Sequence, residues 1–355
     1  MTSARVGSLL PLGVRSVLVI LPSWVGDVCM ATAALRTLRS LRPNTEIVAF
    51  GRPALAPLIA GLPFVDRFAG GSMRGFGVLG ELRRLRRDGY DAVLVLPNSL
   101  RSALFTSAVG ARHRAGTSRN ARGWLLTHAT DDPRGLRTAT SVYARLVAEW
   151  TGTPTAIGPP ELATTPSDRQ GAASLLGDAA TDVPARSWLL INPGANRTDK
   201  RWDSSRFSEA ARAIAASRID GLDPERVAVT GAPQEAEICA SIARESGALD
   251  LCARGISLGS LKGVLERTRL LITNDTGPSH MAAALRAPCL TLFGPTDHRW
   301  TPCDYPLERR VIAEPFLGAD SLADDHAAHC AINRITIADV VHAARALVER
   351  TSSKV

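Results

Sequence analysis

The chain has 355 residues, of which 45% are hydrophobic and 21% charged, so it has enough apolar material for two ordinary cores and is not a mostly disordered chain. The formal net charge is +8, and all but three of the 42 Lys and Arg residues are arginine. That bias reflects either GC-rich coding or affinity for anionic ligands.

No segment predicts a membrane-spanning helix, because the longest apolar run, residues 17–28, is short and contains a proline, a glycine and an aspartate. Pro11 and Gly13 interrupt the apolar run near the N-terminus, so we expect no cleaved secretory signal. The six cysteines form no C-x-x-C pair and lack the histidine spacing of a zinc site. We therefore expect a soluble protein with free thiols in a reducing cytoplasm.

Short β-rich runs alternate with helical patterns along the chain, which is typical of α/β domains with parallel sheets. A stretch rich in Pro, Thr and Gly at 151–160 separates two sets of strands, and the domain boundary should fall between 160 and 185. Both domains would direct the carboxyl ends of their strands to one inter-domain cleft, where function is expected. The predicted strands are 16–21, 46–50, 91–96, 188–192, 226–230, 270–273 and 289–293.

The first motif is LPSWVGDVCMATAALRTLR, residues 21–39, where a strand breaks and a glycine–aspartate pair opens an amphipathic helix. Asp27 at a helix start is explained by capping and by the helix dipole, which stabilise a helix by about 0.5–2 kcal/mol. The functional alternative is a general base at the cleft edge, within reach of a substrate hydroxyl. Trp24 beside it either packs in the core or stacks on a sugar.

The second motif is NPGANRTDKRWDSSRF, residues 192–207, a strand followed by a glycine turn with polar and cationic residues. Such a turn offers backbone amides and an ammonium group to a phosphate. Lys200 is one of only three lysines in the chain, which favours a function, although a solvated loop lysine has the same sequence signature. Trp202 and Phe207 suit core positions better than ligand contacts.

The third motif is LLITNDTGPSHMAAAL, residues 270–285, again a strand, a glycine turn and a helix. Gly277 allows close approach of a ligand, and exposed first-turn N–H groups bind anions. Pro278 suits the first helical turn because its missing donor costs nothing there. His280 is the best candidate histidine of the chain, although a lone histidine is usually structural.

The stretch from Ala92 to Thr130 contains no Asp or Glu but five arginines. It forms either a solvated basic surface or a site for a phosphorylated or carboxylated acceptor. Nucleic acid is not expected, because aromatic residues are not interleaved with the arginines and no known binding motif is present. The RRLRR run at 83–87 should lie on an exposed helix face. The five arginines are Arg101, Arg112, Arg114, Arg119 and Arg122.

Two motif classes are missing from the sequence. There is no G-x-x-x-x-G-K-[ST] loop of a nucleoside triphosphatase, and no G-x-G-x-x-G turn of a dinucleotide-binding domain. A D-x-D triad, the usual metal-holding signal of a nucleotide-sugar enzyme, is also missing. A leaving diphosphate would then be neutralised by Lys200 and backbone dipoles, with no metal and no cofactor.

Together and in this order, the three motifs resemble those of the ADP-heptose:lipopolysaccharide heptosyltransferases, glycosyltransferase family 9, over residues 17–341, and the opening motif is most similar to the heptosyltransferase II branch. The resemblance implies an α/β GT-B fold, in which two Rossmann-like parallel-sheet domains face an inter-domain cleft. Residues 1–165 would bind the acceptor and residues 185–335 the nucleotide sugar. For a C-terminal helix at 336–355, packing back on the first domain is one option. The transfer would be inverting and metal-independent.

The same resemblance assigns roles to individual residues. Asp27 would be the general base, and Lys200 would bind the diphosphate or the sugar. Glu235, in TGAPQE, falls at a looser match where the family has an acidic residue for the ribose. The acceptor would contact Trp24 and the arginines Arg112, Arg114, Arg119 and Arg122. The donor-binding set is Asn196, Thr198, Lys200, Glu235, Asp275, Thr276, Gly277 and His280, with Arg197 as a neighbour of the phosphates.

The chain departs from the family pattern near its C-terminus, where many relatives carry paired cysteines before C-x-x-x-I. Here only Cys330 remains, and residues 324–329 replace the rest. About thirteen residues before the first strand are also extra. These departures leave the acceptor and the pathway open more than the fold or the donor chemistry.

We expect a cytoplasmic, monomeric enzyme that moves heptose from ADP-heptose to an anionic glycolipid or sugar acceptor, the inner core of lipopolysaccharide. A peripheral position at the cytoplasmic face of the inner membrane stays open. The first alternative is a GT-B enzyme that uses a related sugar nucleotide on a small-molecule or other glycan acceptor. The others are a nucleotide-sugar epimerase or hydrolase of the same shape and a non-catalytic sugar-nucleotide-binding protein.

Overall fold

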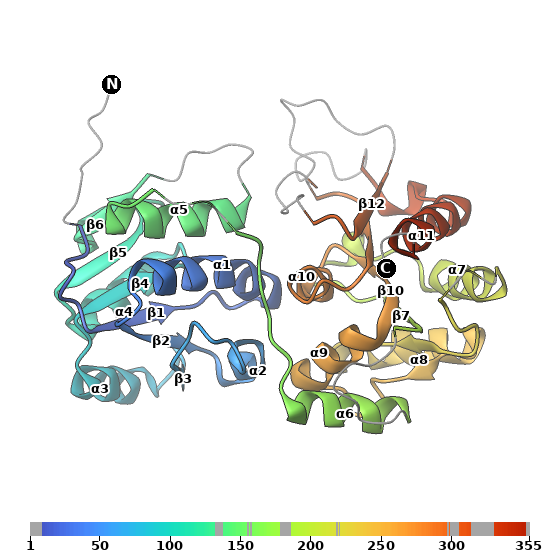
Figure 1. Cartoon of the computed structure of the whole chain (residues 1–355), viewed down its shortest axis with the longest axis horizontal. Coiled ribbons are helices and arrows are strands. Elements are labelled where there is room, and N and C mark those ends of the chain that lie inside the picture. The colour runs from blue at the N-terminus through green and yellow to red at the C-terminus, as the bar shows by residue number, and fades with distance from the viewer. Residues whose placement is uncertain are drawn as a thin grey trace. The chain divides into compact units, whose positions relative to one another are not determined.

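The computed structural model describes residues 9–131, 138–154, 156, 158–177, 186–217, 219, 221–296, 298, 305–313 and 330–352. The chain divides into two compact units, the first ending at Ala163 and the second beginning at Thr164. Both are α/β units, coloured blue to green and green to red in Figure 1. The division lies within the interval 160–185 that the sequence indicates for the domain boundary.

The first unit contains a six-stranded parallel sheet in the order β3-β2-β1-β4-β5-β6. Its strands are β1 (Ser16–Ile20), β2 (Glu46–Gly51), β3 (Arg67–Gly70), β4 (Ala92–Val95), β5 (His113–Thr117) and β6 (His128–Thr130). Its helices are α1 (Val25–Leu41), α2 (Ala56–Ile59), α3 (Val78–Asp88), α4 (Leu100–Val109) and α5 (Ala139–Thr151), with short 3-10 turns at Pro53–Leu55 and Gly123–Leu125.

Helices cover both faces of this sheet, which explains why its central strands consist of consecutive apolar residues. Residues 17–20 of β1 and all of β4 are buried. Helices α1 and α5 pack together, whereas α3 packs with α4. Phe105 of α4 stacks on Phe50 of β2 at 5.4 Å between ring centroids. In α3, Leu85 is buried while Arg83, Arg86 and Arg87 are exposed, as predicted for the RRLRR run.

The second unit contains another six-stranded parallel sheet, in the order β12-β11-β10-β7-β8-β9. Its strands are β7 (Trp188–Asn192), β8 (Val227–Val229), β9 (Leu249–Asp250), β10 (Thr268–Asn274), β11 (Cys289–Phe293) and β12 (Glu308–Ile312). Its helices are α6 (Pro166–Leu176), α7 (Ser204–Ala216), α8 (Ala236–Ser246), α9 (Leu258–Arg267), α10 (Gly277–Ala284) and α11 (Ile337–Ser352). Short 3-10 turns span Thr198–Lys200, Pro233–Glu235 and Ile332–Arg334.

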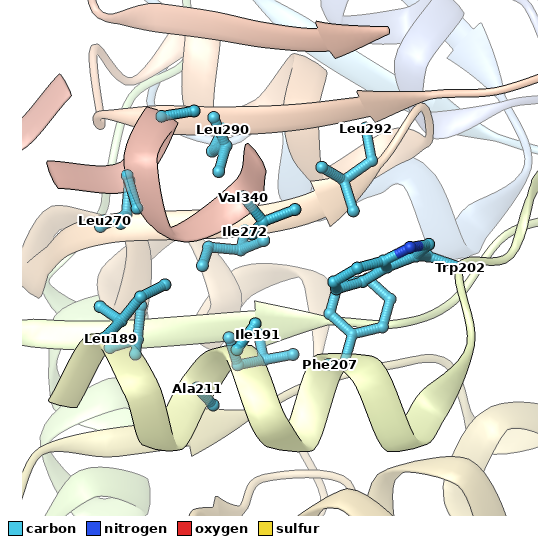
Figure 2. Packing of buried hydrophobic residues seen from close by; sticks show 14 of the residues in the cluster. Leu189, Ile191, Trp202, Phe207, Ala211, Leu270, Ile272, Leu290, Leu292 and Val340 are labelled. Atoms are coloured by element: carbon cyan, nitrogen blue, oxygen red, sulfur yellow. The ribbon is translucent and has the colours of Figure 1, made fainter. Parts of the chain in front are cut away.

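The core of the second unit lies between the sheet and helices α7 and α11 (Figure 2). Trp202 and Phe207 meet edge to face in it, with ring centroids 5.0 Å apart, so the core role predicted for both is confirmed. The Trp202 indole N–H donates to the carbonyl of Ile335, 3.0 Å away. This bond satisfies the one polar atom of a buried tryptophan.

Helix α11 belongs to the second unit. Val340, Ala344 and Val348 lie one turn apart and are buried in the same core as β7 and β10, and the helix packs on α7 and β12. Within the second unit, the helix therefore has packing partners on the sheet and on α7. The apolar stripe of α11 accounts for this packing, because it covers the same face of the sheet beside α7.

Helix α6, which opens the second unit, is fixed to α9. The side chain of Thr165 caps α6, and the carboxylate of Asp168 accepts hydrogen bonds from the backbone and hydroxyl of Thr165. The same carboxylate lies 2.9 Å from the ammonium of Lys262, which is fully buried on α9. Gly263 allows this close crossing, since a Cβ there would lie 2.5 Å from the carbonyl oxygen of Asp168.

Both sheets follow the same chain path. The first strand lies in the middle, the next two extend the sheet on one side, and the fourth returns to the other side of the first. The direction of winding therefore reverses between β1 and β4 in the first unit and between β7 and β10 in the second. In open parallel sheets, ligands bind beyond the carboxyl ends of the strands at such a reversal.

Candidate active site

Asn274, the last residue of β10, organises the candidate site of the second unit. Its side chain is fully buried, and its amide nitrogen donates to the carbonyls of Pro193 and Gly194, at 2.8 and 3.3 Å. Its amide oxygen accepts from the backbone N–H of Trp202 at 3.2 Å. One side chain thus fixes both ends of the loop 193–202 against the end of β10. The sequence motif includes Asn274, but its spacing gave no indication of this role.

A second polar link joins the two strands at the reversal point. The side-chain amide of Asn192 donates to the hydroxyl of Thr273 at 2.9 Å, and that hydroxyl donates to the carbonyl of Asn274 at 3.0 Å. Asn192, Thr273 and Asn274 are all buried. Buried polar groups need such partners, and the resulting network restricts the loops after β7 and β10 to one arrangement.

Lys200 and Asp275 meet within this network. The Lys200 ammonium lies 3.3 Å from Asp275 Oδ2, and both side chains are 15% exposed. The hydroxyl of Thr296, beyond β11, donates to the same carboxylate oxygen at 3.1 Å. An ammonium carries three N–H donors, so a group paired with one carboxylate retains the capacity to bind phosphate oxygens. The structure therefore brings together the lysine and the aspartate that the motifs single out.

The helix after Asp275 begins without a side-chain cap. Thr276 is the N-cap residue of α10, in extended conformation, and its hydroxyl makes no capping hydrogen bond. Its carbonyl accepts from the backbone N–H and the hydroxyl of Ser279, at 3.1 and 2.7 Å. Gly277 and Pro278 form the first turn, and His280 follows, half-buried. The positive end of the helix dipole at such a turn favours an anion.

Glu235 lies at the same edge of the sheet, in the 3-10 turn after β8. Its carboxylate accepts from the backbone N–H of Ala232 at 2.8 Å. It also lies against Gly194, where a Cβ would overlap the carboxylate oxygens. Glu235 is thus adjacent to the turn that Asn274 holds.

Other residues of the second motif that were singled out from the sequence lie on the loop after β7. Asn196 and Thr198 are exposed, with their side chains at the surface of the loop. Arg197 pairs with Asp199, and this hydrogen-bonded pair lowers the pKa of the Asp199 carboxyl. The guanidinium of Arg201 donates twice to the carbonyl of Ala195, at 3.0 and 2.8 Å, which closes the loop.

In the first unit, Asp27 lies in the first turn of α1, directly beyond the carboxyl end of β1. It is half-buried, and the N-cap residue is Trp24, whose side chain makes no capping hydrogen bond. Asp27 is therefore not the cap residue itself, although its carboxylate lies where the helix dipole stabilises negative charge. Trp24 is 63% exposed, so of its two alternatives the core position is wrong.

The four arginines expected at the acceptor fall at two opposite edges of the sheet. Arg112 precedes β5 and Arg114 lies near its amino end, whereas Arg119 and Arg122 follow its carboxyl end. The guanidinium of Arg114 donates to the carbonyls of Ala111 and Leu125, at 2.8 and 3.0 Å. Because the strands are parallel, only the arginines beyond the carboxyl end share an edge with Asp27.

Arg122 is fully buried and has a structural role in place of the expected surface contact with the acceptor. Its guanidinium donates to the carbonyls of Thr117, Pro97 and Ser99, and to the side chains of Thr117, Ser102 and Asn98. All of these acceptors are neutral oxygens, and burial lowers the pKa of Arg122 to about 10. The residue joins the loops after β4 and β5, on which Asn98 and Arg119 lie.

None of the helices in the described ranges is long and apolar enough to cross a membrane. Within the same ranges, no three His, Cys, Asp or Glu side chains are grouped as they would be around a metal ion.

Two six-stranded parallel sheets of Rossmann type in one chain, each with a reversal of winding at its centre, are the architecture of the GT-B fold. A family model described as glycosyltransferase family 9 (heptosyltransferase) matches residues 80–315. The chain belongs to this family.

Curated relatives and solved structures agree with this membership. Lipopolysaccharide heptosyltransferase 2 of Escherichia coli K12 is 29% identical over 301 residues, which cover 81% of this chain and 84% of that protein. Lipooligosaccharide heptosyltransferase 2 of Haemophilus influenzae is 26% identical over 305 residues, covering 81% and 85%. The structure of E. coli ADP-heptose lps heptosyltransferase II has a TM-score of 0.78 at 24% identity, covering 95% of this chain and 99% of that one. A family 9 glycosyl transferase from Veillonella parvula has a TM-score of 0.80 at 20% identity, covering 96% and 99%.

Proposed function

We propose that this enzyme transfers heptose from ADP-heptose to the inner core of lipopolysaccharide, with inversion at the anomeric carbon. The observation that carries the donor half is the Lys200–Asp275 pair beside the start of α10, with Glu235 at the neighbouring turn. An ammonium and an uncapped helix start suit a diphosphate, and a carboxylate suits a ribose or sugar hydroxyl. The names of the curated relatives, heptosyltransferases of lipopolysaccharide and lipooligosaccharide, support the same sugar and acceptor.

In the proposed reaction, Asp27 takes the proton of an acceptor hydroxyl while the oxygen attacks the anomeric carbon of the donor. The bond from that carbon to the diphosphate oxygen breaks, and ADP leaves with the electron pair. Lys200 and the first turn of α10 stabilise the charge that develops on the departing phosphate. Asp275 holds Lys200 in position and contacts the donor sugar, while Asn196, Thr198 and His280 border the phosphates.

We further propose that acceptor binding uses the edge of the first unit beyond the carboxyl ends of its strands. Trp24 is 63% and Leu100 45% exposed near this edge, and Arg119, exposed beyond the carboxyl end of β5, adds positive charge to the same edge. An exposed indole stacks on sugars, and an arginine binds phosphate or carboxylate groups of an anionic core oligosaccharide. Peripheral association with the cytoplasmic face of the inner membrane and a monomeric state belong to the same proposal; vesicle sedimentation and light scattering test them.

The test of the proposed function is ADP release from ADP-heptose in the presence of EDTA, with and without a heptose-deficient lipopolysaccharide core. Acceptor-dependent release that survives EDTA supports transfer without a metal. Saturable donor binding without release on this acceptor would keep the donor and reject the acceptor, and a panel of small-molecule and glycan acceptors would follow. Release or conversion of the sugar without any acceptor would indicate an epimerase or a hydrolase, and loss of all donor binding would reject ADP-heptose.

A further inference from the structure

Cys239 and Cys252 form a close thiol pair that the mechanism does not use. Cys239 lies on α8 and is fully buried, whereas Cys252 follows β9 and is half-buried, and their sulfur atoms are 3.1 Å apart. A disulfide bond is about 2.05 Å long, so closure needs a shift of only about 1 Å. Spacing in the sequence does not reveal this pair, because thirteen positions separate the two residues.

The two thiols differ in reactivity in a way that favours attack by Cys252. The hydrogen bond between the two sulfur atoms lowers the pKa of the Cys252 thiol, although burial and the nearby carboxylates Asp250 and Glu235 oppose the shift. The same hydrogen bond and burial raise the pKa of Cys239. The pair therefore has a nucleophile at the more exposed position and a second thiol behind it to resolve a mixed disulfide.

The pair lies directly behind the turn that carries Glu235. The Cys252 thiol donates to the carbonyl of Gly231, with sulfur and oxygen 3.3 Å apart. A Cβ on Gly231 would lie 2.8 Å from the sulfur of Cys239 and 3.1 Å from the Glu235 carboxylate. A change at either sulfur is therefore transmitted to the segment 231–235 without intervening side chains.

We propose that Cys239 and Cys252 are a redox-active dithiol whose oxidation to a disulfide alters the turn 231–235 and weakens binding of the donor nucleotide. That this turn contacts the nucleotide rests on the proposed function, whereas disulfide formation does not. In the reaction, the Cys252 thiolate attacks a low-molecular-weight disulfide and releases one thiol. Cys239 then loses its proton and attacks the mixed disulfide, releasing a second thiol, so two electrons and two protons pass to the oxidant. Closure removes the thiol donor from the Gly231 carbonyl.

The first measurement is the intact mass and peptide map of the folded protein after treatment with glutathione disulfide. We expect loss of two hydrogens and a Cys239–Cys252 linkage in the wild type and in Cys330→Ala, which removes a buried thiol elsewhere. Cys252→Ser should not form the linkage, and its circular dichroism shows whether it is folded. Failure of the folded wild type to form this linkage would overturn the proposal.

The second measurement compares the oxidised and reduced wild type. We expect altered hydrogen exchange at the amides of Ala232 and Glu235, which form hydrogen bonds within this turn. We also expect ADP to bind about two- to tenfold more weakly to the oxidised protein, as for the loss of one hydrogen bond. If the reduced protein does not bind ADP, the proposed donor site fails, and the exchange rates still decide whether the disulfide acts on the turn. Formation of the disulfide with unchanged exchange and unchanged ADP affinity would overturn the coupling.

Discussion

Lys200 Nζ and Asp275 Oδ2 lie 3.3 Å apart, although 75 residues separate them in the sequence. The contact forms because β7 and β10 are neighbours in the sheet, so the loops after these two strands meet at one edge. With both side chains largely buried, each charge depends on the other more than it would at the surface.

Replacing Lys200 by methionine should weaken ADP binding and lower turnover by about 10² to 10³, because a positive charge at the departing phosphate is lost. Isothermal titration with ADP and single-turnover kinetics measure the two effects. Arg212→Met, which removes an exposed charge on α7, is the control and should change neither. In the double variant Lys200→Met/Asp275→Asn, the loss of ADP binding free energy should be no larger than the sum of the losses in the two single variants, because the two side chains interact. Wild-type turnover in Lys200→Met would remove Lys200 from the mechanism.

Replacing Asp27 by asparagine should leave ADP affinity unchanged and reduce acceptor-dependent ADP release at least about 10²-fold, as expected for loss of a general base. The amide keeps the shape of the side chain in the first turn of α1, so folding should be preserved. Activity near the wild-type level would assign the base elsewhere.

Replacing Gly194 by alanine should displace the Glu235 carboxylate, because the new methyl group would overlap it. We expect ADP binding about tenfold weaker, consistent with the loss of one or two polar contacts. The matched control is Gly80→Ala on α3, where nothing lies within 4 Å of the added Cβ. That variant should gain stability of about 0.5–1 kcal/mol and retain ADP affinity.

Replacing Arg122 by lysine should destabilise the first unit by about 2–4 kcal/mol, because an ammonium cannot reach the several carbonyls and hydroxyls that the guanidinium joins. Urea unfolding measures the loss, and Arg119→Lys at an exposed position is the control.

The contribution of Arg122 to the free energy of unfolding should depend on pH. The pKa of Arg122 is lowered to about 10 from 12.5 by burial, so the folded protein releases this proton before the unfolded chain does. Between these two values the unfolded state binds more protons, and the contribution of Arg122 to the free energy of unfolding rises with pH. Below about pH 9 both states are protonated, so the stability difference between wild type and Arg122→Gln, which has no titratable group at this position, should be constant. A difference that changes between pH 6 and pH 9, by about 1 kcal/mol, would contradict this.

Arg119 and Arg112 provide a paired test of the acceptor edge. Arg119→Ala should raise the KM for a core oligosaccharide about threefold to tenfold, as expected for one ionic contact. Arg112→Ala should leave it unchanged, because Arg112 precedes the amino end of β5. The reverse result would place the acceptor at the opposite edge of the sheet.

Sequence patterns predicted the central strands well, because strands buried on both faces are runs of apolar residues. The spans predicted for β7 and β11 agree with the structure residue for residue, and those for β1, β4 and β10 differ only at their ends. The short or outer strands β3, β5, β6, β9 and β12 were missed. RFAG, HRAGT and ERRVI carry charged residues and lack a clear apolar run, while β6 and β9 have only three and two residues.

Within the candidate site, the contacts between residues distant in the sequence could not be predicted. Lys200 and Asp275 each stood out as part of a strand–turn–helix motif, yet only the sheet order shows that they meet. Arg122 could not be distinguished from Arg119 by its neighbours in the sequence, because a buried guanidinium is recognised by its acceptors, which come from residues 97–102 and 117. The thiol pair was missed because α8 and β9, although consecutive in the chain, bring the sulfur atoms of Cys239 and Cys252 together only when the helix packs back on the strand.

The contacts that fix α6 also determine where a recombinant fragment containing the second unit can begin. The backbone N–H of Glu161 donates to Thr32 of α1 at 2.9 Å, and its carboxylate pairs with Arg36, so the first unit holds the chain up to that residue. Thr165 already caps α6, which the buried Lys262–Asp168 pair fixes to α9. Only Leu162, Ala163 and Thr164 lie between these anchors. A recombinant fragment that begins at Thr164 keeps the Thr165 cap and the Lys262–Asp168 pair, whereas one that begins after α6 leaves the charge of Lys262 buried without this carboxylate.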